Sequence, residues 1–194
     1  MPYKYFISII VAAIFSVTNI NPSSAQLAQD NLVKWVIEKN STLSVEGKSN
    51  INSFTCNINE YTGTDSIIVS NDPSKPIKLS GDLQMNVMSF NCHSSLITKD
   101  LRKTLNSDEY PKMIIRFLSI QSMPALQGNR EDIKGWVEVE LAGCTKRFEI
   151  CYSFSKAGDA LIQLNGGHTF CFSDFNLSPP RKLAGLIKIK DNLT

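Results

Sequence analysis

The sequence contains no block of like charges, and its 20 basic and 18 acidic side chains nearly balance at a formal net charge of +2. Nucleic-acid binding and attraction to an anionic membrane surface both depend on clustered positive charge. After the first 25 residues the chain also lacks an apolar run long enough to cross a bilayer. We therefore expect neither a nucleic-acid partner nor a stable membrane span in the mature protein.

The sequence also lacks the spacings that metal sites and hydrolases use. It has no CxxC pair, and its two histidines, His93 and His168, lie far apart. Neither histidine is accompanied by a nucleophile elbow. The acidic pairs Asp108–Glu109 and Glu131–Asp132 are typical of solvated loops. We expect no metal, no other cofactor and no enzymatic activity.

The first 25 residues have the organisation of a secretory signal peptide. Lys4 precedes the apolar run Phe6–Val17, and small residues ending at Ala25 provide a cleavage site. A helix of that apolar length spans about 18 Å, well short of a hydrocarbon core of about 30 Å. We predict cleavage between Ala25 and Gln26, export to the periplasm, and a single domain over 26–194.

The positions of the cysteines indicate which disulfide an exported chain can form. Two of the five stand in a repeated tetrapeptide, Ser53–Cys56 (SFTC) and Ser89–Cys92 (SFNC). In a strand, residues two positions apart point to the same face, so each string brings a ring and a sulfur to one side. Oxidising compartments allow such thiols to pair. We predict a structural disulfide between Cys56 and Cys92. The pairings left open involve Cys144, Cys151 and Cys171.

Most of the chain after residue 30 alternates between apolar and polar residues with a period of two, which predicts β-strands. The clearest cases cover 77–87, 137–141 and 148–154, and turn signals such as Asn165–Gly167 separate the strands. Because helices and strands do not alternate along the chain, we expect an antiparallel sheet. Such a sheet forms either a sandwich or a barrel.

One segment changes to a helical period. Ile97, Leu101 and Leu105 recur at every fourth position, and Ser94 or Ser95 can cap the start. The apolar stripe of this amphipathic helix has to cover an apolar surface. We therefore predict one helix that covers an end of the sheet or barrel.

From Leu32 onward the chain resembles the YceI-like family of exported bacterial lipid-binding proteins. The resemblance is carried by Ser41–Cys56 (STLSVEGKSNINSFTC), 99–117 (KDLRKTLNSDEYPKMIIRF), 137–150 (VEVELAGCTKRFEI) and 172–191 (FSDFNLSPPRKLAGLIKIKD). It implies a mainly β fold, an antiparallel lipocalin-like barrel of about eight strands with one covering helix. In characterised members the lumen holds a long apolar molecule such as a polyisoprenoid.

The resemblance also implies a function. We expect a periplasmic carrier that sequesters a polyisoprenoid or other lipid in the lumen, because burying a chain at about 0.8 kcal/mol per CH₂ needs no polar partner. The alternative is a filled core and a protein-interaction module that binds through an exposed sheet edge, since the family usually continues through a further apolar strand beyond Thr194. The predicted ligand-binding residues, taken from the apolar strand faces, are Leu79, Leu83, Met85, Val87, Ile115, Phe117, Val137, Val139, Leu141, Phe148, Ile150 and Tyr152.

Overall fold

The strands of the protein form two antiparallel sheets. The computed structural model describes residues 31–59, 61–71, 77–125, 130–157, 161–182 and 187–193. The first sheet has seven strands, in the order β1 (Asn31–Val36), β4 (Ser66–Asn71), β5 (Ile77–Asn86), β6 (Lys112–Ile120), β7 (Glu131–Leu141), β8 (Cys144–Lys156) and β9 (Ile162–Gly167). The second has five, in the order β10 (Phe170–Cys171), β12 (Ile187–Leu193), β2 (Leu43–Ser49) and β3 (Ser53–Ile58), with β11 (Arg181–Lys182) paired to β12.

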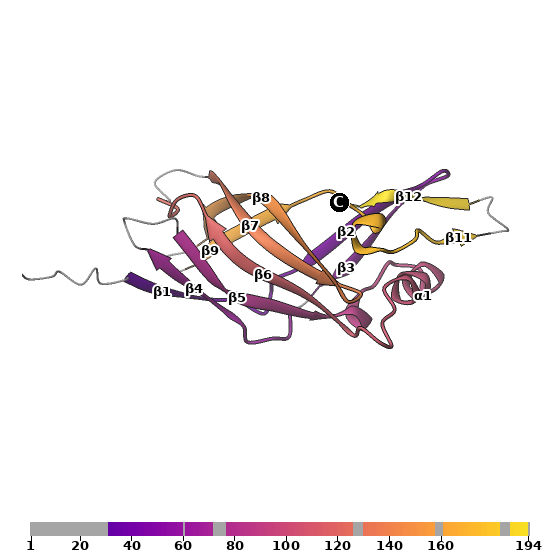
Figure 1. Cartoon of the computed structure of the whole chain (residues 1–194), viewed down its shortest axis with the longest axis horizontal. Coiled ribbons are helices and arrows are strands. Elements are labelled where there is room, and N and C mark those ends of the chain that lie inside the picture. Colours follow the sequence, from indigo (N-terminus) through magenta and orange to yellow (C-terminus); the bar gives the residue numbers. More distant parts are fainter. Residues whose placement is uncertain are drawn as a thin grey trace, which may run out of the picture.

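The seven-stranded sheet curls into a half-barrel, with the second sheet extending towards the end that carries the helix (Figure 1). Two register shifts, one between β5 and β6 and one between β6 and β7, accompany the curl, because a bulge bends the strand that contains it. Trp35 on β1 contacts Phe154 on β8 at 6.1 Å between ring centroids, although these strands are far apart in the sheet order. The curl therefore brings the two edges of this sheet towards each other.

The long hairpin of β7 and β8 is formed by a two-residue turn. Ala142 and Gly143 connect Leu141 to its partner Cys144, and both turn residues have positive φ angles, 48° and 75°. Two-residue turns of this hand match the right-handed twist of the strands. The tight turn fixes the register through the whole hairpin, so that Val137 lies opposite Phe148.

The predicted helix is confirmed. It forms α1 (Ser95–Thr104), and the Ser94 hydroxyl accepts a hydrogen bond from the Ile97 backbone N–H at 3.5 Å. Leu101 and Leu105 are buried in the core, so the apolar stripe packs as the sequence predicts. Before α1, the 3₁₀ turn η1 (Val87–Ser89) ends the run of β5, where the apolar phase of the sequence changes.

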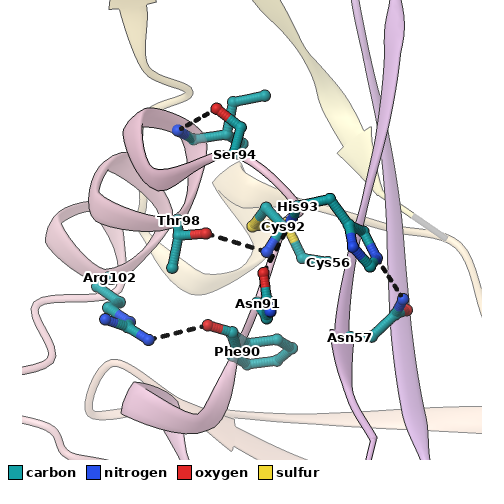
Figure 2. The surroundings of a disulfide bond; sticks show 10 residues. Cys56, Asn57, Phe90, Asn91, Cys92, His93, Ser94, Thr98 and Arg102 are labelled. Atoms are coloured by element: carbon teal, nitrogen blue, oxygen red, sulfur yellow. Dashed lines mark hydrogen bonds between the residues drawn. A yellow bond between two sulfur atoms is a disulfide. The ribbon is translucent and has the colours of Figure 1, made fainter.

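The repeated tetrapeptide forms a crosslink: Cys56 and Cys92 are joined by a disulfide, as predicted. The bond connects β3 to the segment between η1 and α1 (Figure 2). Beside it, Asn57 and Asn91 exchange two backbone hydrogen bonds of 2.8 and 2.9 Å. On the helix side, the Cys92 N–H donates to the Thr98 hydroxyl at 3.0 Å. The crosslink therefore ties the second sheet to the amino end of the helix.

The predicted mainly β, lipocalin-like architecture with a covering helix is confirmed. The strands exceed the expected eight because short strands such as β10 and β11 extend the second sheet. Strand β12 lies between β10 and β2 in the second sheet. Within the described part of the chain, the helix falls well short of the length and apolar character that a membrane span needs.

Candidate ligand-binding face

The predicted ligand-binding residues gather on the inner side of the half-barrel, which we call the concave face. Strand pairing places them in rows that cross the sheet, since directly opposed residues point to the same side. One row joins Leu83, Ile115 and Val139, and a second joins Phe117, Val137 and Phe148. Every predicted residue belongs to the buried core cluster or packs against it.

These residues divide into two groups by burial. The protein's own packing buries Leu79, Met85, Val87, Val137, Val139, Leu141 and Tyr152. The remainder are half-buried although they face inward, namely Leu83, Ile115, Phe117, Phe148 and Ile150. Apolar side chains that point into a half-barrel and keep accessible surface form a surface that a ligand can cover.

The concave face extends beyond the residues predicted from the sequence. Ile133 on β7 lies opposite Tyr152, and Val69 on β4 lies opposite Leu79. Trp35 and Phe154 close the face on the far side through their ring contact. Ile133 and Phe154 continue the period-two patterns of their strands, so the sequence carried a signal for both. The contact of Trp35 with Phe154 depends on the curl of the sheet, which the sequence pattern does not show.

Exposed apolar side chains also stand on the inner side of the two edge strands, β1 and β9. Val33 is paired with Val69, and Leu164 is paired with Phe154, so both belong to the concave face. Ile162 lies on the same side of β9 as Leu164. All three side chains are exposed. We refer to Val33, Ile162 and Leu164, which are exposed on the concave side of the two edge strands, as the seam.

Away from the seam, an aromatic cluster packs between the two sheets. Phe148 contacts His168 at 4.7 Å, and Phe170 and Phe175 at 6.0 Å each. Phe170 belongs to β10, and Phe175 to the 3₁₀ turn η2 (Phe172–Phe175). His168, which the sequence leaves without a catalytic partner, therefore packs against an aromatic ring.

Two charged side chains share the inner side of β8, Lys146 near the β7–β8 turn and Lys156 at the other end, opposite Ile162. Lys146 lies directly opposite Val139, and its side chain points to the same face of β8 as that of Phe148. It is exposed and lies near the β7–β8 turn. Each end of the inner side of β8 therefore carries a lysine.

Three cysteines lie outside the disulfide. Cys144, Cys151 and Cys171 are free thiols. Burial, followed by the carboxylates of Asp191 and Asp174, raises the pKa of the Cys171 thiol and keeps it protonated. Across the described residues, no group of three or more histidine, cysteine or acidic side chains could hold a metal ion.

A separate groove of about 1220 Å³ lies between η1 and α1. Its lining exposes polar and apolar surface in similar amounts and includes Ser95, Lys99, Arg102 and Asn106. The Arg102 guanidinium is already engaged, because it donates to the backbone carbonyls of Met88 and Phe90. The concave face is the more uniformly apolar of the two surfaces, so we place the candidate site there.

Comparison with known proteins identifies the fold. No protein-family model matches the chain, and no curated protein matches it significantly. Among solved structures, a polyisoprenoid-binding domain from Saccharophagus degradans, implicated in plant cell wall breakdown, is similar with a TM-score of 0.60 at 14% identity, over 84% of this chain and 93% of that one. The chain shares the fold of this domain. The family resemblance found in the sequence is thus confirmed at the level of the fold.

Two further structures resemble this one. BcnA from Burkholderia cenocepacia aligns with a TM-score of 0.52 at 18% identity, over 81% of this chain and 98% of its own. A YceI protein from Campylobacter jejuni aligns with a TM-score of 0.47 at 16% identity, over 67% of this chain and 71% of its own. The first shares the fold along nearly its whole length, while the second is too distant to add to the comparison.

Proposed function

We propose that this protein is an exported binding protein that holds a polyisoprenoid or other long-chain lipid against its concave face. The observation that carries the proposal is the group of half-buried, inward apolar side chains, represented by Leu83, Ile115 and Phe117. A solid core would cover these side chains, whereas a chain-like ligand lying along the half-barrel removes them from water. The shared fold with a polyisoprenoid-binding domain supports the same ligand class.

The energetics of such a ligand fit the site. Each buried methylene contributes about 0.8 kcal/mol, so a long chain gains affinity from length without any ionic contact. The seam of Val33, Ile162 and Leu164 offers an apolar entry for the chain between the two sheet edges. We propose no catalytic step, because the candidate face contains no activated nucleophile or acid–base pair.

Export is part of the proposal. The predicted signal peptide, residues 1–25, lies outside the described residues, as does the cleavage site after Ala25. The Cys56–Cys92 disulfide supports export, because such bonds form and persist in oxidising compartments such as the periplasm. The mature protein is accordingly proposed to be a single periplasmic domain over 26–194.

Strand addition at a sheet edge is the second candidate function. β1 and β9 are the edges of the seven-stranded sheet, and β9 carries the exposed Ile162 and Leu164, with the exposed Leu161 just before it. An edge strand with unpaired backbone groups accepts a partner strand, and apolar side chains strengthen the contact. This candidate predicts a co-purifying protein and no bound lipid.

The two tryptophans provide the experiment for the lipid proposal. Trp35 faces the interior next to Phe154, whereas Trp136 lies on the outer face, where Arg147 packs over its ring. A brominated long-chain hydrocarbon quenches a tryptophan that it touches. In the Trp136→Phe variant, titration with this probe is expected to quench Trp35 emission in a saturable manner.

The Trp35→Phe variant is the matched control, because its remaining reporter, Trp136, lies on the opposite side of the sheet. Its emission is expected to stay unchanged over the same titration. Equal quenching in both variants indicates nonspecific surface adsorption and contradicts binding on the concave face. Absence of quenching in both variants contradicts the lipid proposal itself.

A further inference from the structure

Tyr152 places a hydroxyl group inside the apolar concave face. It lies on β8 directly opposite Ile133 of β7 and Gly166 of β9. Its neighbours on the same side of β8 are Ile150 and Phe154, and its ring packs 6.5 Å from that of Phe117. Every one of these neighbouring side chains is apolar.

Two glycines create the space that this ring occupies. A Cβ atom on Gly135 would lie 2.7 Å from Cε2 of Tyr152, and a Cβ atom on Gly166 would lie 2.9 Å from Cδ1. Contacts that short do not occur, so a side chain at either position would displace the ring. The ring is thus seated over the backbones of β7 and β9, which fixes the position of the hydroxyl group.

The Tyr152 hydroxyl has no hydrogen-bond partner among the described residues, although the residue is 4% exposed. Tyr61 is buried to a similar extent, at 3% exposed, but its hydroxyl donates to the Asp65 carboxylate. Buried polar groups are nearly always paired, and an unpaired one costs free energy. Phe117 and Phe154 show that this face accepts rings without a hydroxyl group.

We propose that the Tyr152 hydroxyl is the polar anchor of the ligand and hydrogen-bonds its one oxygen-bearing group, an alcohol or carbonyl on an otherwise apolar chain. This inference rests on the proposed lipid-binding function. The anchor adds ligand specificity, because a pure hydrocarbon covers the apolar side chains of the concave face but leaves the Tyr152 hydroxyl group unpaired. Burial raises the pKa of Tyr152, so the phenol stays protonated and remains a donor.

The test compares two probes that differ mainly in one hydroxyl group, the prenyl alcohol farnesol and the hydrocarbon farnesene. Each competes with the brominated hydrocarbon in the Trp136→Phe background, with Trp35 emission as the readout. Tyr152→Phe deletes one oxygen atom and keeps the ring. The ratio of farnesol affinity to farnesene affinity is expected to fall about three- to tenfold, the range for one hydrogen bond.

Tyr61→Phe is the matched control, because it also deletes a buried tyrosine hydroxyl but lies outside the concave face's ligand residues. It is expected to lower stability, measured by urea denaturation, and to leave the affinity ratio unchanged. Tyr152→Phe is expected to leave the stability of the ligand-free protein unchanged or raised. An unchanged ratio of farnesol to farnesene affinity in Tyr152→Phe contradicts the proposed role of Tyr152 as the anchor. An equal fall of this ratio in Tyr61→Phe also contradicts it. Failure of both probes to compete in the parent protein instead overturns the lipid-binding function.

Discussion

Replacing both Cys56 and Cys92 by serine is expected to lower the free energy of unfolding by about 2–5 kcal/mol. The disulfide closes a loop of 36 residues, and its removal frees that loop in the unfolded chain. In the folded protein the bond joins β3 to the segment that starts α1, next to the Asn57–Asn91 bridge (Figure 2). The loss should therefore loosen the contact between the second sheet and the helix.

Urea denaturation of the oxidised parent and the double-serine variant measures this effect. Mutation is preferable to reduction, because Cys56 is fully buried and a reductant reaches the bond slowly. Cys151→Ser is the control: it removes an exposed free thiol and should change stability by less than about 0.5 kcal/mol. Equal stability of the double variant and the parent would show that the crosslink is not structural.

Ile150→Asp is expected to weaken binding of apolar ligands more than tenfold. Ile150 is a half-buried member of the concave face, and its cross-strand partner is Gly135, which offers no charge. A carboxylate that a ligand would cover there costs at least about 2 kcal/mol, and more than 1.4 kcal/mol corresponds to tenfold in affinity. We choose this position over Val139, because Lys146 lies opposite Val139 and would pair with an introduced carboxylate.

The control for this prediction is Cys151→Asp, which introduces the same charge one residue further along β8. Cys151 is exposed on the outer side, opposite Lys134, so binding should be unaffected. A desolvated carboxyl group has a raised pKa, so binding to Ile150→Asp should partly recover as the pH falls and the group becomes neutral. Equal affinity of Ile150→Asp and the parent protein, measured by Trp35 quenching, would contradict the assignment of this face.

The sequence predicted those features of the fold that local patterns determine. Alternation along 77–87 and 148–154 assigned the inward side chains, because successive residues of a strand point to opposite faces. The Ser94 cap and the spacing of Leu101 and Leu105 located the helix. The repeated SFxC string identified the disulfide, since each cysteine shares a strand face with a phenylalanine.

Features that depend on long-range pairing could not be predicted. The division of the strands into two sheets and the seam between β1 and β9 follow from the curl of the sheet, which depends on bulges and distant contacts. Half-burial of Phe117 and Ile150 follows from the same curl. A period-two pattern shows to which face a side chain points, but not how much of that side chain other residues cover. The unpaired hydroxyl of Tyr152 is equally invisible in the sequence, where tyrosine fits the apolar pattern.

Native mass spectrometry of protein purified without detergent tests the central claim most directly. The account predicts a species heavier than the polypeptide by the mass of one apolar molecule, which organic extraction releases and which carries an oxygen-bearing group. The Ile150→Asp variant should lack this species, and the Cys151→Asp variant should retain it. Parent protein found entirely at the mass of the bare polypeptide, or bound instead to another protein at a sheet edge, would contradict the account.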